Sequence, residues 1–185
     1  PVMTNAVVVR PIFWGTKFAN NPEYTNALKV AMSRLYNGYS GTNYAKISQQ
    51  YNQTGGLQTS ILTSATYPYI DGTVAKYSKT ADISTEVLKV YGADLSNDAY
   101  YPVYTDLPRG NATFCAWHSY VTTNTGKVVK FAFFFDLTND NGCVVPLADN
   151  GWSQPVQNLA NVSVHELTEA MTDPKLNAWS DKFGA

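Results

Sequence analysis

The sequence of 185 residues predicts a single α/β (α+β) domain in which helices cover a mixed β-sheet. This length suits one domain with its own hydrophobic core. Segments with apolar residues at helical spacing are interspersed with short runs rich in valine, phenylalanine and tyrosine, as expected for mixed helices and strands. No internal repeat or linker is visible, so residues 1–185 are expected to form one unit. The natural chain is expected to continue beyond its last residue.

The first half of the chain predicts a strand followed by helices. Residues Ala6–Gly15 are mostly apolar, meet a proline and end at glycine, which indicates a buried strand. Pro22 suits the first turn of a helix that ends at Gly38, and a short helix follows at Asn43–Tyr51. Residues Leu57–Tyr77 are rich in threonine, serine and tyrosine and form either short strands or an ordered loop.

A third helix and a strand come next. Asp82 or Ser84 is placed to cap a helix that runs through Tyr91, and Gly92 ends it. Tyr100–Thr105 has the composition of a strand. The chain therefore returns to the sheet after this helix.

The clearest local signal is a β-hairpin. Residues Phe114–Thr122 and Lys127–Leu137 read as strands on either side of an Asn124-Thr125-Gly126 turn. Residues Phe131–Phe135 are apolar at every position, so their side chains would be buried on both faces of the sheet. The second strand of the hairpin is therefore predicted to be central.

A last helix follows the hairpin. Pro155 lies just inside its start, Ser153 is placed to cap it, and Asp173-Pro174 ends it near Thr172. We expect this helix to pack against the sheet through small and apolar residues at helical spacing, namely Val156, Leu159, Ala160, Ser163, Leu167, Ala170 and Met171.

The same helix carries the only chemically distinctive segment, His165-Glu166-Leu167-Thr168-Glu169. Residues four apart share one face of a helix, so His165 and Glu169 project together. In H-E-x-x-H metalloproteases the two residues four apart bind zinc and the first glutamate is the general base. Glu169 replaces the second histidine here, and a carboxylate is also a zinc ligand. Zinc is therefore the expected cofactor, with Glu166 as the catalytic base.

A catalytic zinc ion takes three protein ligands. His118 is the only other histidine and lies on the first strand of the hairpin, so it is the best candidate for the third ligand. Asp173 lies too far along the helix from His165 to share an ion and is expected to orient a ligand instead. The alternative is structural: Glu166, Glu169 and Asp173 form a solvated helix face, and His165 is a core histidine bonded to a backbone carbonyl.

Composition excludes several classes of protein. The net charge of −1 and the lack of a basic stripe argue against nucleic-acid binding. No apolar run approaches the roughly 20 residues of a membrane-spanning helix, so no membrane partner is expected. No nucleophile elbow, phosphate loop or dinucleotide fingerprint is present. Charged residues are only 15%, so asparagine, threonine and the 13 tyrosines must supply much of the polar surface.

Several features point to an extracellular glycoprotein. Cys115 and Cys143 permit one disulfide or remain buried thiols. Three N-x-S/T sequons begin at Asn52, Asn111 and Asn161. We expect a glycan on at least one of Asn52 and Asn111. Asn161 lies one turn before the metal-binding segment, so it is expected to be unmodified if that segment is active.

The segment His165–Trp179 resembles the hallmark segment of the phosphate-induced protein 1 (EXORDIUM-like) family, H-E-(L/I)-x-E-x-x-(T/S)-(D/N)-P-x-x-N-A-W. Residues Pro11–Gly15 and Cys115–Ser119 are similar to the first strand and the Cys-x-(W/Y) segment of that family. Its members are secreted proteins of plants, with relatives in fungi and bacteria. The resemblance implies a cell-surface location and a link to cell walls and growth, without an established reaction. Members continue past the equivalent of Trp179 to another cysteine, which leaves the cysteine pairing open.

Three functions are compatible with these observations. The first is a secreted zincin-like metallohydrolase, intact or degenerate, that acts on a cell-wall or other extracellular polymer. The alternative is a non-catalytic structural glycoprotein that self-associates into a sheath or filament, for example by adding a strand to a neighbour's sheet. A carbohydrate-binding module is a third reading, supported only by the aromatic content.

Overall fold

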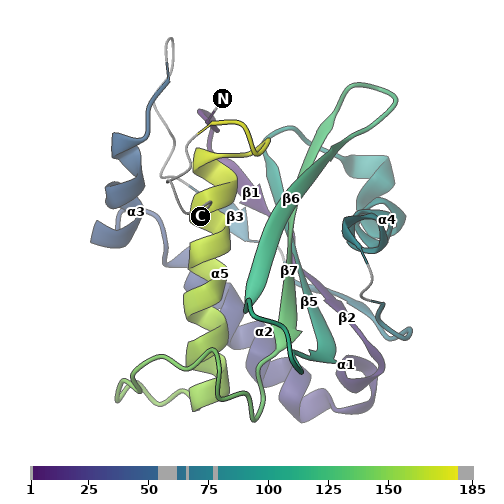
Figure 1. The fold of residues 1–185 in the computed structure, drawn as a ribbon, viewed down its shortest axis with the longest axis vertical. Coiled ribbons are helices and arrows are strands. Elements are labelled where there is room, and N and C mark those ends of the chain that lie inside the picture. Colours follow the sequence, from purple (N-terminus) through teal and green to yellow (C-terminus); the bar gives the residue numbers. More distant parts are fainter. Residues whose placement is uncertain (1, 54–61, 66, 77–78, 179–185) are drawn as a thin grey trace.

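The computed structural model describes residues 2–53, 62–65, 67–76 and 79–178 (Figure 1). Thr54 of the first sequon and Trp179 of the family-like segment lie outside these residues. In the described part, seven strands form one sheet, and helices cover both of its faces. The predicted single α/β domain with a mixed, helix-covered sheet is confirmed.

The predicted first strand is split into two short strands. β1 (Val7–Val9) and β2 (Ile12–Trp14) are separated by Arg10-Pro11, where proline has no backbone N–H for the ladder. β1 pairs in parallel with β3 (Leu62–Ala65), and β2 pairs in parallel with β4 (Tyr69–Asp71). The segment predicted as short strands or loop therefore contributes one edge of the sheet.

The long strand β5 (Ala99–Pro108) forms the centre of the sheet. It extends beyond the predicted Tyr100–Thr105 and pairs in parallel with β1 and β2 on one side and with β7 (Val128–Asp136) on the other. β7 also pairs in antiparallel fashion with β6 (Ala116–Thr122), which completes the predicted hairpin. β6 is therefore an edge strand, and it is the antiparallel member of an otherwise parallel sheet.

The helices lie on both faces of the sheet. α2 and α5 contact each other on one face, and α4 packs on the other (Figure 1). The α-helices are α1 (Thr16–Asn20), α2 (Pro22–Asn37), α3 (Asn43–Ile47), α4 (Thr80–Tyr91) and α5 (Gln154–Thr172). Short 3-10 turns follow α3 at Ser48–Gln50 and α4 at Gly92–Asp94.

The predicted helix starts need two corrections. α4 begins at Thr80, so Asp82 and Ser84 lie inside its first turns rather than at the cap. Asp82 still suits this place, because a carboxylate interacts favourably with the positive end of the helix dipole. Ser153 does occupy the N-cap position of α5, but its side chain makes no capping hydrogen bond.

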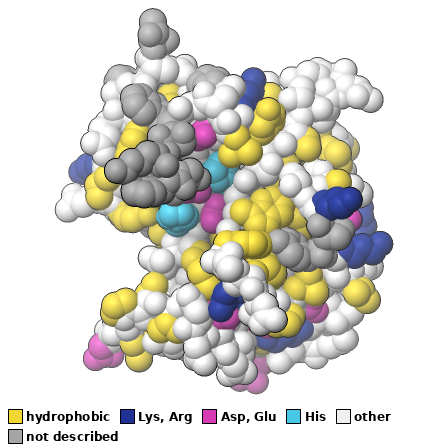
Figure 2. Space-filling view, viewed as in Figure 1, with side chains coloured by type: hydrophobic (Ala, Val, Ile, Leu, Met, Phe, Trp, Pro, Cys, Tyr) yellow, Lys and Arg dark blue, Asp and Glu magenta, His cyan; other side chains and the backbone are white. Residues whose placement is uncertain are grey.

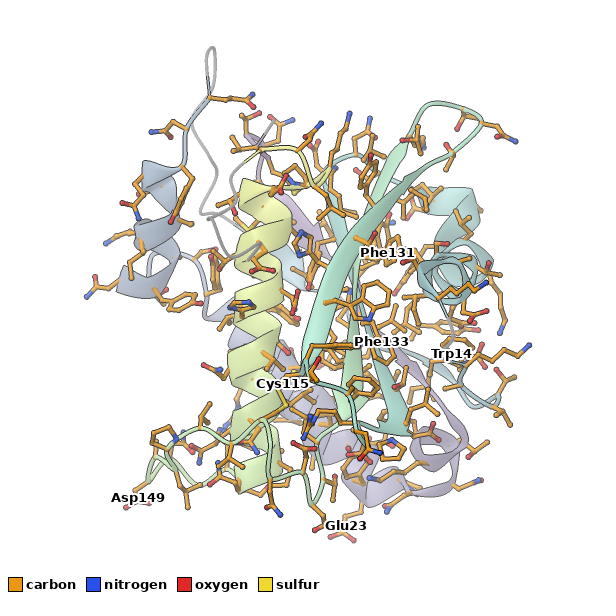
Figure 3. The ribbon with its side chains drawn as sticks, viewed as in Figure 1. Trp14, Glu23, Cys115, Phe131, Phe133 and Asp149 are labelled. Atoms are coloured by element: carbon orange, nitrogen blue, oxygen red, sulfur yellow. A yellow bond between two sulfur atoms is a disulfide. The ribbon has the colours of Figure 1, made fainter. Side chains whose placement is uncertain are left out.

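β7 is the buried central strand that its apolar run predicts. Each of Phe131–Phe135 is at most 3% exposed. Phe131 and Phe133 point toward the α4 side of the sheet, where the Trp117 ring lies on Phe133 with centroids 5.5 Å apart (Figure 3). Alternate residues such as Phe134 point toward α5, where Phe134 stacks on Tyr104. Both faces of this strand are thus part of the core.

A disulfide joins Cys115, just before β6, to Cys143 in the loop between β7 and α5. It fixes the start of the edge strand to the segment that leads into the last helix. No helix in the described ranges is both long and apolar enough to cross a membrane.

Candidate metal centre

Glu166 lies on the buried side of α5. It is only 4% exposed, although its neighbour His165 has a side chain that is 58% exposed. The buried residues Ser163, Glu166, Leu167 and Ala170 recur three and four apart, so Glu166 is part of the face that packs on the sheet. The burial of Glu166 argues against the alternative in which Glu166, Glu169 and Asp173 form a solvated face of the helix.

His118 reaches α5 from the edge strand β6. Neighbouring residues on a strand point to opposite faces. Since Trp117 packs with Phe133 on the α4 side, His118 points toward α5. Directly opposite His118 on β7 is Ala132, the one small residue in the aromatic run. Its short side chain leaves space for the imidazole ring between the sheet and the helix.

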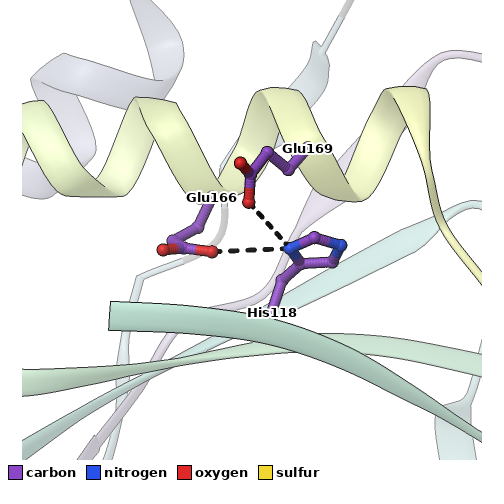
Figure 4. Close-up of side chains that lie close together, drawn as sticks. All are labelled: His118, Glu166 and Glu169. Atoms are coloured by element: carbon purple, nitrogen blue, oxygen red, sulfur yellow. Dashed lines mark hydrogen bonds and ion pairs between the residues drawn. The ribbon is translucent and has the colours of Figure 1, made fainter. Parts of the chain in front are cut away.

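Three side chains meet between β6 and α5 (Figure 4). The Nδ1 atom of His118 lies 3.0 Å from Oε2 of Glu169 and 3.5 Å from Oε2 of Glu166. One potential ligand atom from each residue lies within 4.8 Å of those from the other two. We refer to His118, Glu166 and Glu169 as the His118 cluster.

His165 lies beside the His118 cluster rather than within it. Its Nε2 atom is 3.0 Å from Oε1 of Glu169, so the Glu169 carboxylate bridges the two histidines. The sequence pattern predicts His165 as a ligand and Glu166 as the base, whereas the structure groups Glu166 with His118 and Glu169. The cause is the rotation of about 100° between consecutive helix residues, which turns Glu166 toward the sheet and His165 toward solvent.

The cluster lies on one face of the molecule, where histidine and acidic side chains gather next to a hydrophobic patch (Figure 2). Within the cluster, the side chains of His118 and Glu166 are only 11% and 5% exposed. Glu169, with 26% of its side chain accessible, is the member of the cluster most exposed to solvent.

The electrostatics of the cluster favour a positive charge between the two glutamates. Burial opposes the charge on His118, but the adjacent carboxylates of Glu166 and Glu169 outweigh it and raise the pKa of His118 to about 9. Burial also opposes the charge on Glu169, but the two histidines lower the pKa of this carboxyl to about 2. Burial raises the pKa of Glu166.

Several buried polar atoms at the cluster have no hydrogen-bond partner in the described part of the chain. They are Nε2 of His118, Oε2 of Glu166 and the hydroxyl of Tyr100 beneath them. Oε2 of Glu166 is close to His118 but is not aligned for a hydrogen bond. An unsatisfied buried polar group costs stability, and an ion, a water molecule or a catalytic role can account for it. His118, Glu166 and Glu169 could therefore hold a metal ion.

Asp173 has a local structural task. Its Oδ1 atom accepts hydrogen bonds from the backbone N–H groups of Asn177 and Ala178, at 2.6 and 2.7 Å. Its carboxylate thereby holds the turn that follows α5, and its backbone N–H donates to the carbonyl of Glu169 as the last bond of the helix. The expected role of Asp173 in orienting a ligand is not what its contacts show.

The sequons differ in accessibility. Asn111 and Asn161 are exposed, and Asn52 is intermediate. The Ser163 hydroxyl of the third sequon is fully buried, donates to the carbonyl of Leu159 and lies 2.9 Å from the Tyr104 hydroxyl. The most accessible loop sequon is therefore that of Asn111.

A row of buried tyrosines below α5 escaped the sequence reasoning. The hydroxyls of Tyr36 and Tyr104 lie 2.6 Å apart, and Tyr100 is next along the same face of β5. The spacing of Tyr100 and Tyr104 on a predicted strand was the available signal, because residues four apart on a strand face the same side.

Outside comparisons leave the family of the chain open. The resemblance to the phosphate-induced protein 1 family rests on the sequence motif and remains a prediction. No model of a known protein family and no curated protein matches the chain.

Proposed function

We propose that this chain is an extracellular metalloprotein that binds a zinc ion through His118, Glu166 and Glu169 and hydrolyses a bond in an extracellular polymer. One observation carries the proposal: potential ligand atoms of His118 on β6 and of Glu166 and Glu169 on α5 lie within 4.8 Å of one another. Zinc ligands lie about 2 Å from the ion, so neighbouring ligand atoms are about 3–4 Å apart. Small side-chain movements would bring the three atoms to that spacing.

The charges and atom types also suit a divalent cation. Two carboxylates carry a charge of −2, and an imidazole nitrogen adds a neutral donor of the kind that zinc prefers. In the metal-free protein, protonated His118 neutralises part of the charge of the two carboxylates, as its raised pKa indicates. A bound zinc ion would take the place of that proton.

The chain's own residues then have distinct roles. A zinc ion in a site with an open position supplies Lewis-acid chemistry and activation of water. His118 and the two glutamates would hold it. His165 would accept and return a proton, because its ring is largely exposed and its Nε2 atom is bonded to Glu169. This assignment exchanges the roles that the sequence pattern predicts for His165 and Glu166.

Zinc binding separates the two assignments. We expect one zinc ion per chain in the wild type, loss of zinc in Glu166→Gln, and retention of zinc with loss of hydrolysis in His165→Asn. Exposed Glu23 on α2 offers a matched control, since Glu23→Gln removes one carboxylate far from the cluster. Zinc lost in His165→Asn and kept in Glu166→Gln would restore the predicted assignment. A wild type without affinity for zinc would overturn the proposal.

An extended peptide is the first polymer to test. His118 lies on an edge strand, and within the described residues no strand pairs with the outer side of β6. An open strand edge can bind an extended chain through backbone hydrogen bonds next to the cluster. Hydrolysis of fluorescein-labelled casein by the zinc-loaded protein, with Glu166→Gln as the inactive control, is the corresponding assay.

The location rests on the cysteines and the sequons. A structural disulfide is typical of proteins from oxidising compartments, and both cysteines of this chain are in one. The exposed sequon at Asn111 suits a secreted protein. These features support an extracellular location, as the motif resemblance also implies.

The open edge of β6 favours a second candidate function. A free strand edge is also a site for pairing with another copy of the chain. A non-catalytic protein that assembles into a sheath or filament would show concentration-dependent association in light scattering. It would do so equally in the wild type and in Glu166→Gln, since assembly does not require the cluster.

A further inference from the structure

A second cluster of charged groups lies on the α4 side of the sheet, away from the His118 cluster. Asp71 ends β4, and Glu86 and Lys89 lie one turn apart on α4. Lys89 Nζ contacts the carboxylate of Asp71 and lies 3.3 Å from Oε2 of Glu86. Asp71 is 6% exposed and Glu86 only 3%, whereas the Lys89 side chain is 53% exposed.

A hollow of about 320 Å³ opens beside these groups. Glu86 and Lys89 line it together with Trp14, Thr73, Asp82 and Thr85, and Lys76 adds a second ammonium group to its wall. The hollow lies where the parallel strands β2 and β4 end, because Trp14 and Asp71 are the last residues of those strands. Ligands of open parallel sheets commonly bind at this end of the strands. Its size reaches the lower end of ligand pockets, about 300 Å³.

One buried atom in this wall lacks a partner. Oε1 of Glu86 has no hydrogen bond in the described part of the structure, although Oε2 is bonded to Lys89. Burial, with Asp71 as a second contributor, raises the pKa of Glu86 to about 7. Two carboxylates thus share one ammonium group, and a further hydrogen-bond donor is missing at Glu86.

A metal ion does not suit the place beside Oε1 of Glu86 where a hydrogen-bond donor is missing. Lys89 already lies between the two carboxylates, and a second cation would be repelled by it. Among the described residues, the His118 cluster is the group that brings three metal-ligating side chains together, and Asp71, Glu86 and Asp82 do not. A neutral molecule with hydroxyl groups avoids this repulsion, because each hydroxyl can donate to a carboxylate and accept from an ammonium group.

We propose that this hollow binds a small neutral polyhydroxylated molecule of monosaccharide size. A small rotation of the Glu86 side chain would bring its unpaired Oε1 atom to the hollow, where one hydroxyl donates to it. A neighbouring hydroxyl accepts from Lys89, and the threonine hydroxyls at the rim complete the contacts. The indole of Trp14, whose Nε1 atom donates to Thr73 at 3.1 Å, forms the apolar wall. This site is independent of the metal centre.

The test is a titration followed by NMR, with chelator present so that the His118 cluster does not contribute. Glucose, xylose and N-acetylglucosamine serve as probes, and n-butylammonium serves as a cationic competitor of similar size. The indole N–H signal of Trp14, identified with Trp14→Phe, reports on the hollow. We expect at least one sugar to shift this signal in a saturable way and n-butylammonium to leave it unchanged.

Variants then locate the binding. Glu86→Gln removes the charged acceptor at nearly constant shape and should weaken sugar binding about tenfold. Thr85→Val tests the exposed rim of the hollow without touching the buried carboxylates and should weaken binding severalfold. Glu23→Gln, on α2 across the sheet, should change nothing. Binding that is unaffected by both Glu86→Gln and Thr85→Val, binding of n-butylammonium in place of the sugars, or no binding at all overturns the proposal.

Discussion

The proton on His118 and a metal ion compete for the same two carboxylates. Glu166 and Glu169 lie 3.5 and 3.0 Å from the Nδ1 atom of His118, so whichever cation is present joins β6 to α5. Because Glu166 is buried, leaving it charged without either cation would be costly. The resting protein therefore keeps its histidine protonated where a free histidine would be neutral.

This competition predicts how the stability of the metal-free protein depends on pH. The pKa of His118 is about 9 in the folded state against about 6.5 when unfolded, so its contribution is complete below pH 6.5 and is lost as the pH rises through 9. Other groups also titrate, so the comparison is made with His118→Gln. The difference in free energy of unfolding between the two proteins should shrink by on the order of 2 kcal/mol between pH 6 and pH 9.

Urea denaturation in the presence of chelator measures this difference. The low pKa of Glu169, about 2, keeps that carboxylate charged across the whole range, so it does not disturb the comparison. A difference that grows with pH would show that His118 is not held by the two carboxylates.

A single residue also tests the extracellular assignment. Asn111 is exposed in a turn before β6, where an oligosaccharyltransferase can reach it. Secreted from a eukaryotic host, the protein should lose mass on glycosidase treatment, and Asn111→Gln should remove most of that loss. Intact-mass spectra that do not change on treatment would contradict the prediction.

At the level of elements, the metal centre depends on how closely α5 approaches the β6–β7 hairpin. Ala132 faces His118 across the hairpin and is fully buried. The aromatic side chains on either side of Ala132 point to the other face, so the imidazole lies next to a single methyl group on this strand. The position of His118 is therefore set by packing.

Ala132→Leu should displace the imidazole toward α5. We expect a loss of about 1–3 kcal/mol in stability from overpacking, together with a loss of zinc affinity of at least about tenfold. Phe133→Leu is the control, because it damages the opposite face of the same strand at a comparable cost of about 1–3 kcal/mol. The control should retain its zinc affinity. Equal losses of zinc in both variants would mean that general destabilisation, rather than crowding of His118, is responsible.

The disulfide between Cys115 and Cys143 links the edge strand to the loop before α5, across a sequence separation of 28 residues. Replacing both cysteines by serine should lower the free energy of unfolding by about 2–4 kcal/mol, because the unfolded chain gains conformational freedom. Thermal unfolding with and without reductant provides the measurement. The double variant should be insensitive to reductant, and a wild type that is equally insensitive would show that the bond does not form.

For the whole molecule, sequence patterns predicted the elements whose signals are local. The run Phe131–Phe135 indicated a strand buried on both faces, and Pro155 and Asp173-Pro174 marked the ends of α5 closely. Pro11 was visible in the sequence, but the split of the predicted strand into β1 and β2 depends on which strands pair on either side of it. Pairing between distant segments leaves no local pattern in the chain.

The site was predictable in part for the same reason. Spacing on the helix brought Glu169 to the correct face, and the hairpin placed His118 opposite α5. Spacing alone did not show whether His165 or Glu166 faces the sheet, because that depends on how the helix is rotated about its axis in the fold. Glu86 and Asp71 could not be paired from the sequence, since no motif connects them.

The position of the His118 cluster has a consequence for how long the folded molecule survives. One ion held by His118 on β6 and by Glu166 and Glu169 on α5 would tie together segments that are 48 to 51 residues apart. Such a cross-link acts on unfolding, since α5 cannot leave the hairpin before the ion dissociates. Zinc should therefore lengthen the half-life of the protein during digestion by trypsin, and chelator should shorten it. Glu166→Gln should show the short half-life in either condition, which makes resistance to digestion a property that the environment can switch on or off through a single ion.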